Sequence, residues 1–346
     1  MLKKAKSQVT EYHLLYIIPM LFALASLLIT NPPLEYDDLV RFHIYFDRFK
    51  DMSIDQFIDY ISDLPDYIIP VYIYVCAKIG IPVNILLSII NFITVYILLK
   101  TSLLILSDEK RNFFSCLFIA SAINSAPLLS GVRNMHSIAL LYLGLYFYVN
   151  REYFKSGFLY FFSIGVHFSS LLYSILPGLL IISIRKLKIL WYCSFIGFLM
   201  PVLFLSFTKE SFDAYSSISI IRKIQHYLFI KDYYFRLTYK EIKIIIVSIY
   251  KFSWYVFVLL FLFYQSKNSN DKWLKILFII SILMNISFLF LTVFERISFL
   301  CKIIFVVCLL QENSIKIGLK KRIFIYFIIL FLFQAALFIE GIFDFV

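Results

Sequence analysis

Long apolar runs dominate the chain, and short charged segments separate them. A helix of about twenty apolar residues crosses a bilayer. Apolar runs lie at 13–30, 83–106, 113–129, 134–149, 189–206, 241–264, 273–293, 297–311 and 322–340, and a further run at 157–184 is interrupted near His167. The pattern predicts an all-α integral membrane protein in which residues 1–346 form a single polytopic domain.

Residues 31–82 differ in composition from the rest of the chain. Residues 31–66 contain nine acidic residues and three basic ones, Arg41, Arg48 and Lys50. Because short loops with few bases are typical of the non-cytoplasmic side, this segment is predicted to be an outer loop. Apolar residues recur within it at helical spacing, which predicts a surface-lying amphipathic helix over Ile54–Ile61. The apolar stretch 67–79 is short for a span and is interpreted as a juxtamembrane helix or a crossing.

Loop charge distinguishes two topologies. If 67–79 stays at the surface and 157–184 crosses twice, turning at His167, every short basic loop is cytoplasmic. This preferred arrangement has about eleven spans, a cytoplasmic N-terminus and an outer C-terminus. It puts turns at Ser130–Arg133, His167 and Glu295–Arg296 on the outer face. In the alternative, 67–79 crosses and 157–184 crosses once, which moves two basic loops outside.

Composition supports a membrane protein. Hydrophobic residues make up 61% of the chain and charged residues 16%, well below the charged fraction of soluble domains. The net charge of +11 is interpreted as cytoplasmic loops beside anionic lipid, and no nucleic-acid partner is expected. The five cysteines form no CxxC pair and are interpreted as small core residues. No cleavage site follows the first run, so it is expected to be a retained span.

Ionisable residues at membrane depth are costly and are therefore the candidates for chemistry. Asp37 and Asp38 follow the first span, and one of them is a candidate general base, with Arg41 as a supporting cation. The alternative for the pair is a solvated acidic loop, and that is what we expect of the acids from Asp47 to Asp66.

Arg133 lies between two apolar runs, next to Asn134 and close to His136. A guanidinium at a helix N-terminus is suited to a phosphate ligand, because backbone N–H groups converge there as well. The alternative is an interfacial arginine whose charged end reaches the membrane surface. The sequence predicts a phosphate-binding role for Arg133, supported by its two polar neighbours.

His167 and the pair Glu295–Arg296 interrupt apolar sequence elsewhere. His167 is interpreted either as a base at a break between two half-helices or as a satisfied core histidine. Arg296 is a candidate second phosphate ligand held by Glu295, or half of a structural ion pair. No second histidine or cysteine lies at metal-ligand spacing from His167, so no metal or other cofactor is expected.

A second loop, 207–240, is predicted on the outer face and is basic and aromatic. It contains Arg222 and Arg236, which are candidate contacts for an anionic ligand. The alternative is a basic surface helix seated on lipid headgroups.

The chain resembles bacterial EpsG-like and Wzy-type O-antigen or capsular polysaccharide polymerases. The resemblance rests on DDLVRFHIYF after the first run, on Arg133 before an Ala/Leu/Tyr-rich run, on the histidine of GVHFSSLL, and on the late Arg296. The order of an acid, a surface helix, a juxtamembrane helix and a second span also resembles GT-C membrane glycosyltransferases.

The resemblance implies a membrane glycosyltransferase of the bacterial inner membrane. It implies transfer of an undecaprenyl-diphosphate-linked oligosaccharide onto the next lipid-linked repeat unit at the outer face, with a chain-length regulator as a possible partner. Asp37, Asp38 or His167 would be the base, and Arg133 and Arg296 would neutralise the diphosphate, with loop cations helping. The alternatives are a flippase of lipid-linked oligosaccharide and a GT-C enzyme that uses a polyprenyl-phosphate sugar donor.

Overall fold

The computed structural model describes residues 2–28, 38–62, 64, 66–123, 131–194, 254–265, 271–287 and 291–343, without the side chains of 2–12, 38–39, 172, 287, 291–296 and 333–343. These residues form helices and no strand. They divide into unit 1, residues 1–177 with 306–346, and unit 2, residues 178–305. The all-α class is therefore confirmed for the described part of the chain.

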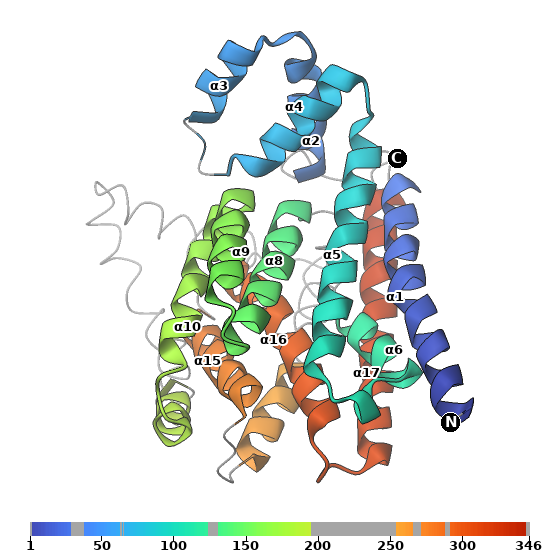
Figure 1. Cartoon of the computed structure of the whole chain (residues 1–346), viewed down its shortest axis with the longest axis vertical. Coiled ribbons are helices and arrows are strands. Elements are labelled where there is room, and N and C mark those ends of the chain that lie inside the picture. The colour runs from blue at the N-terminus through green and yellow to red at the C-terminus, as the bar shows by residue number, and fades with distance from the viewer. Residues whose placement is uncertain are drawn as a thin grey trace, which may run out of the picture. The chain divides into compact units, whose positions relative to one another are not determined.

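Unit 1 contains the long helices near both ends of the sequence (Figure 1). Its elements are α1 (Leu2–Leu28), α2 (Asp38–Asp51), α3 (Ile54–Ser62), α4 (Ile68–Ile79), α5 (Val83–Ile105), η1 (Asp108–Lys110), α6 (Phe113–Ala122), α8 (Val132–Val149), α9 (Tyr153–Val166), η2 (Phe168–Ile175) and α17 (Ile317–Phe343). The short α10 (Leu176–Leu179) and the long α16 (Leu291–Gln311) each extend across the division between the units.

Helices α1 and α5 lie side by side and run in opposite directions (Figure 1). The Ser88 hydroxyl donates to the carbonyl oxygen of Ala23 at 2.8 Å, and the Asn91 amide donates to the Ser26 hydroxyl at 2.6 Å. The end of α1 thus meets the beginning of α5. Hydroxyl and amide groups of this kind are common links between helices in an apolar bundle.

Helix α8 runs parallel to α5. Thr94 Oγ1 lies 2.9 Å from His136 Nδ1, and two turns further along, Ser102 Oγ lies 3.2 Å from the Tyr142 hydroxyl. All four side chains are buried. The hydrogen bonds fix both the direction and the register of the two helices.

The chain passes along α8 twice more after it leaves that helix. On α9, Ser163 Oγ donates to the Ser137 carbonyl at 2.9 Å. The Ser170 hydroxyl of η2 returns to the level of Ser137, and the Tyr148 hydroxyl donates to the Pro177 carbonyl at 3.3 Å. Helix α9 is therefore antiparallel to α8, whereas η2 and α10 run parallel to it.

This reversal at His167 is the one that the preferred topology predicts for residues 157–184. Helix α8 ends in a tight turn before α9, in which Glu152 N donates to the Phe147 carbonyl at 2.9 Å and Arg151 adopts a left-handed φ of 66°. Helices α5 and α8 thus run in one direction, α9 runs back, and η2 again follows the direction of α8.

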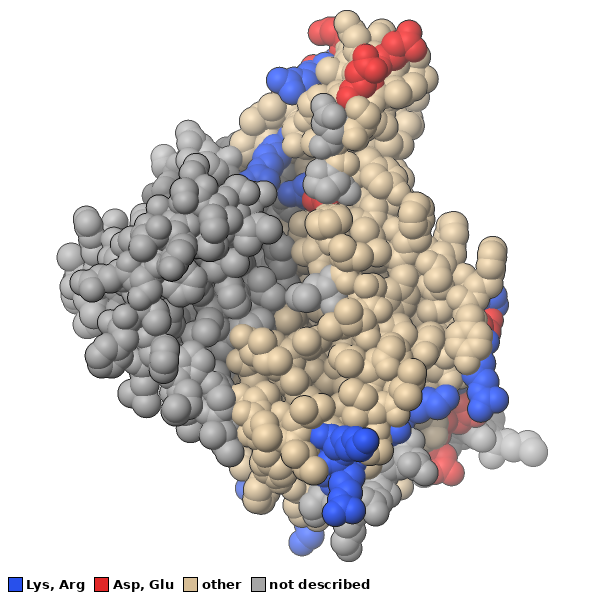
Figure 2. Space-filling view, turned by 90° about the vertical axis from the view of Figure 1, so that its left-hand side faces the viewer, with Lys and Arg blue, Asp and Glu red and all other residues tan. Residues whose placement is uncertain are grey.

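Helices α2, α3 and α4, which we call the cap, lie at one end of unit 1 beyond the ends of α8 and α9 (Figure 1). Aromatic and branched residues from all three helices and from the neighbouring helices form the core of the cap; its most buried members include Phe42, Phe49, Phe57, Ile69 and Ile73. Figure 2 shows acidic side chains gathered over the upper end of the molecule, where the cap exposes acids of α2 and α3.

The helix predicted over Ile54–Ile61 is α3, and the juxtamembrane helix predicted at 67–79 is α4. Helix α4 packs along α2, and the Lys78 ammonium donates to the Lys50 carbonyl at 2.7 Å. At its end, Gly80 takes a left-handed φ of 75°, which lets the chain turn directly into α5.

The opposite end of unit 1 is joined by contacts between two loops. The Lys110 ammonium lies 2.5 Å from Asn313 Oδ1, and the Gln311 amide donates to the Ile105 carbonyl at 2.8 Å. These contacts place the connection from α5 to α6 beside the connection from α16 to α17, at the end of unit 1 opposite the cap (Figure 1).

Unit 2 has helices over 184–194 and Trp254–Tyr264, together with α15 (Lys272–Ser287) and the first part of α16. Buried polar side chains connect three of them. The Trp191 indole donates to Ser281 Oγ at 2.8 Å, and the Tyr255 hydroxyl reaches Ser281 Oγ at 2.7 Å and Asn285 Oδ1 at 2.8 Å. The segment 207–240, predicted as an outer basic loop, lies outside the described residues.

The structure limits one prediction about the spans and corrects another. Within the described residues, only α5 is both long and apolar enough on its own to cross a membrane; the eleven predicted spans are not established. The turn predicted at Glu295–Arg296 is wrong, because α16 begins at Leu291 and continues through both residues. Glu and Arg both favour helices, so a charged pair interrupts an apolar pattern without interrupting the helix.

Candidate functional site

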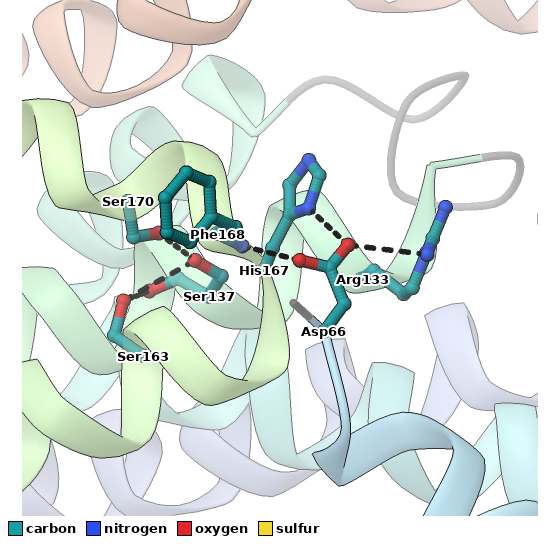
Figure 3. A network of polar contacts seen from close by, with 7 residues as sticks. All are labelled: Asp66, Arg133, Ser137, Ser163, His167, Phe168 and Ser170. Carbon is teal, nitrogen blue, oxygen red and sulfur yellow. Dashed lines mark hydrogen bonds and ion pairs between the residues drawn. The ribbon is translucent and has the colours of Figure 1, made fainter. Parts of the chain in front are cut away.

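Three segments of unit 1 meet at the carboxylate of Asp66 (Figure 3). The backbone N–H of Phe168 donates to Asp66 Oδ1 at 2.6 Å. His167 Nδ1 lies 2.9 Å from Asp66 Oδ2, and Arg133 Nη1 lies 3.3 Å from the same oxygen. One acid thus connects a cation and an imidazole that are distant from it in sequence.

Local structure explains how each group reaches the cluster. Asp66 lies two residues before α4, and Arg133 is the second residue of α8, after Gly131 at the N-cap. His167 leaves the helical conformation, with φ −154° and ψ 114°, and so ends α9. The chain changes direction there, and the next N–H, that of Phe168, points to Asp66.

The cluster is largely shielded from solvent. The side chains of Asp66, Arg133 and His167 are 14%, 15% and 13% exposed. Burial acts to raise the pKa of the Asp66 carboxyl, but hydrogen bonds from His167 and Phe168, with the charges of His167 and Arg133, outweigh it. The pKa of Asp66 is therefore lowered, and the carboxylate stays ionised at neutral pH.

A close approach between the cap and α9 holds Asp66 in place. A Cβ atom added at Gly165 would lie 2.8 Å from Ile68 Cδ1 and 2.9 Å from Tyr67 Cζ. Only glycine leaves room for these two side chains. The residue after Asp66 therefore packs directly on the helix that ends at His167.

Arg133 has a second contact with the cap. Its guanidinium carbon lies 5.9 Å from the centre of the Phe42 ring, within the range of a cation–π interaction. Phe42 is buried in the cap core. Arg133 thus joins α8 to both α2 and the segment before α4.

Three buried serines join the helices behind the cluster (Figure 3). The Ser137 hydroxyl contacts the hydroxyls of Ser163, at 3.2 Å, and of Ser170. These residues belong to α8, α9 and η2, so the reversal at His167 is fixed on both sides.

The imidazole of His167 has one ring nitrogen that Asp66 does not contact. In Figure 3 this second ring nitrogen points away from Asp66. The arrangement suits an imidazole that accepts a proton on that nitrogen.

The structure brings together two residues predicted from the sequence, Arg133 and His167, through a third that was misjudged. The expectation of a solvated loop acid at Asp66 is wrong, because its carboxylate contacts Arg133, His167 and the backbone N–H of Phe168. The sequence does not single out Asp66, because residues 31–66 contain nine acids and no pattern distinguishes one from the others. A usable signal exists, since Asp66 directly precedes an apolar run, as His167 and Arg133 also adjoin apolar runs.

The remaining predicted residues near the cluster have different surroundings. His136 is buried and bound to Thr94, between α5 and α8. Asn134 is half-buried, and its Oδ1 has no hydrogen bond among the described residues. Arg41 is exposed on α2. Asp38 begins α2, but its side chain is not described.

Five other predicted residues have no described side chain. Asp37, Arg222 and Arg236 fall in undescribed segments, and α16 contains Glu295 and Arg296 without described side chains. The prediction that Arg296 shares one cavity with Arg133 and His167 therefore stays a prediction.

Comparison with known families adds to this geometry. Residues 12–344 match the EpsG family, and this match covers nearly the whole chain. The chain belongs to the EpsG family. This is a family of Wzy-like polysaccharide polymerases, so the predicted resemblance is confirmed. Neither the curated proteins nor the solved structures gave a match.

Membership in the EpsG family indicates a polysaccharide polymerase, and a polymerase of this kind is a glycosyltransferase-type enzyme. The helical architecture is compatible with a membrane protein. The Asp66 cluster lies within the matched residues.

Proposed function

We propose that this EpsG-family protein transfers a glycan from undecaprenyl diphosphate onto the next lipid-linked repeat unit, at the outer face of the bacterial inner membrane. The observation that carries the proposal is the contact of Asp66 with both Arg133 and His167. It provides an oriented base next to a cation, which are the two groups that this transfer needs.

His167 is the base in this proposal. Asp66 accepts the Nδ1–H hydrogen bond, which fixes the tautomer and leaves Nε2 as the proton acceptor. The acceptor sugar hydroxyl attacks the anomeric carbon of the donor glycan and gives its proton to Nε2. The bond between the anomeric carbon and the phosphate oxygen breaks, and the diphosphate leaves with the electron pair. Asp66 stabilises the imidazolium that forms.

Arg133 supplies positive charge for the diphosphate. It lies in the first turn of α8, where backbone N–H groups and the helix dipole also favour an anion. A guanidinium matches phosphate oxygens through paired hydrogen bonds. We propose that Arg133, with Arg296 and cations of the 207–240 loop, neutralises the leaving group without a metal ion.

The membrane orientation completes the proposal. The cap and the cluster lie at one end of unit 1, whereas Lys110 and Arg111, together with Lys316 and the bases in the first turns of α17, lie at the other. The positive-inside tendency assigns the latter to the cytoplasm. The cluster is then at the outer surface, at the depth of lipid headgroups.

The experiment is complementation of a deletion strain, read on a gel of surface polysaccharide. We expect His167→Gln to lose long polymer and to leave a single capped repeat unit, because base catalysis contributes about 10²–10⁴-fold. His43→Gln, on α2 and outside the cluster, is the matched control and should polymerise normally.

Three other outcomes would count against the proposal. Normal polymer from His167→Gln at normal expression would exclude His167 as the base. Loss of even the capped unit would favour a flippase. If the native protein adds one sugar from a polyprenyl-phosphate donor, a GT-C transferase replaces the polymerase.

A further inference from the structure

An apolar strip of surface begins at the cluster. Three side chains of η2 are about half exposed: Phe168 at 50%, Leu171 at 45% and Ile175 at 46%. Phe168 and Leu171 are three residues apart and so lie on one side of this 3₁₀ helix; together with the exposed Ile175 further along it, they form what we call the η2 face. On the other side, Ser170 and Tyr173 are buried against the bundle. The η2 face is therefore held in a fixed orientation.

The η2 face is continuous with the cluster at one end. Phe168, its first residue, donates its backbone N–H to Asp66. The contacts of Ser170 with Ser137, and of Pro177 with Tyr148, show that η2 then runs away from the cluster along α8. Charged groups thus lie at the start of an apolar track.

The length of the track matches one leaflet. Seven residue steps of about 2.0 Å each separate Phe168 from Ile175, roughly 14 Å in all. Half of a hydrocarbon core of about 30 Å is roughly 15 Å. With the cluster at headgroup depth, the η2 face spans the outer leaflet.

We propose that the η2 face binds the first isoprenoid units of a polyprenyl diphosphate whose head lies at Arg133. The inference rests on the proposed function and names the surface that receives the lipid tail. An amphiphile with an anionic head and an apolar tail needs a cation and an apolar track that meet, and they meet at Phe168. Ordinary acyl chains cover any exposed apolar helix but have no reason to prefer this face.

The neighbouring helix offers a matched comparison. Helix α9 exposes Phe158 at 60% and Phe161 at 66%, more than any residue of the η2 face. Phe158 and Phe161 precede the reversal at His167 by nine and six residues, and Phe158 stacks on Phe162 with ring centres 6.1 Å apart. Lipid exposure alone would therefore favour α9, whereas a tail anchored at the cluster would favour η2.

Photo-crosslinking distinguishes these possibilities. The full-length protein carries p-benzoylphenylalanine in place of Leu171 or Ile175, or of Phe158 or Phe161, in phospholipid nanodiscs. The probe is ³²P-labelled undecaprenyl diphosphate at a low fraction of the lipid. We expect several-fold more label at the two η2 positions than at the two α9 positions, and Arg133→Gln should lower the η2 label to the α9 level. Labelled phosphatidylglycerol should show no preference for η2.

Equal labelling at all four positions, or stronger labelling on α9, would overturn the proposal. So would η2 labelling that Arg133→Gln leaves unchanged, because the head would then not anchor the tail. The result is separable from the proposed function. If His167→Gln polymerises normally while η2 is labelled selectively, the catalytic proposal fails and the lipid site stands. If polymer is lost and labelling is uniform, only the lipid site fails.

Discussion

The two ends of unit 1 both hold buried or half-buried cations, but they use them differently. At the end opposite the cap, Arg111 donates to three carbonyl oxygens in the last turn and C-cap of α5, at 2.6, 3.0 and 3.3 Å. Lys320 likewise donates to the carbonyl oxygens of Leu310 and Glu312 at the end of α16. At the cap end, Arg133 lies in the first turn of α8 and contacts the carboxylate of Asp66.

The helix dipole acts differently on the cations at the two ends of unit 1. The last carbonyls of a helix lack partners and carry partial negative charge, so Arg111 and Lys320 stabilise the helices that they cap. A cation in the first turn opposes the helix dipole. Arg133 therefore gains no stabilisation from the helix dipole, and it contacts Asp66 and the Phe42 ring instead. In the proposed function, an anionic ligand is the further reason for a cation at this position.

The largest expected effect comes from the acid that distinguishes the cap end. Asp66→Asn keeps the shape but removes the charge that orients His167 and balances Arg133. We expect the rate of polymerisation to fall by about 10²–10⁴-fold, as when a triad acid is replaced. Radiolabelled repeat units and purified protein give the rate directly.

Asp47→Asn is the matched control for this change. Asp47 belongs to the same acidic segment, its side chain is 73% exposed, and it pairs only with Lys50 among the described residues. Its replacement should leave the rate unchanged, because exposed pairs contribute little. Similar losses in both variants would mean that net loop charge, and not the Asp66 contacts, controls activity.

The opposite end should respond in stability. Arg111→Ala leaves carbonyl oxygens of α5 without their donor and removes the 2.8 Å ion pair with Asp108. We expect the free energy of unfolding to fall by about 2–3 kcal/mol, on the scale of hydrogen bonds to charged groups. Thermal unfolding in detergent measures the loss. The rate per folded molecule should stay near the native value, and a rate that falls as far as that of Asp66→Asn would remove the distinction between the ends.

A smaller effect is expected where the cap meets α9. Gly165→Ala would push a methyl group against Tyr67 and Ile68, and should lower the free energy of unfolding by about 1–2 kcal/mol through overpacking. Gly157→Ala, in the same helix with open space around it, should be neutral or stabilising by roughly 0.5–1 kcal/mol. Equal melting temperatures for the two variants would show that the cap does not pack on α9 as described.

The sequence predicted most of the described helices because apolar runs report directly on helices that face lipid or core. Charge parity also predicted the reversal at His167, which the serine contacts bear out. Glu295–Arg296 was misread, since a charged pair in apolar sequence resembles a turn although both residues are compatible with a helix. The pattern of hydropathy registers polarity and not backbone geometry.

Two residues of the Asp66 cluster, Arg133 and His167, were predictable from hydropathy, whereas Asp66 was not. Arg133 and His167 each interrupt an apolar background, so their cost at membrane depth marks them. Asp66 follows a solvated acidic stretch, and nothing in its immediate sequence records the contact of Tyr67 with Gly165 that buries it. Tyr67 and Gly165 are about one hundred residues apart in the sequence, and a contact over that separation is visible only in the three-dimensional structure.

If Asp66 and His167 act as one catalytic pair, a double-mutant cycle shows it most directly. The polymerisation rate is measured for Asp66→Asn, His167→Gln and the double variant, each normalised to folded protein. We expect the double variant to be about as slow as the slower single variant, because groups that act as a unit are non-additive. Losses that multiply, so that the double variant is slower by the product of the two single effects, would contradict it.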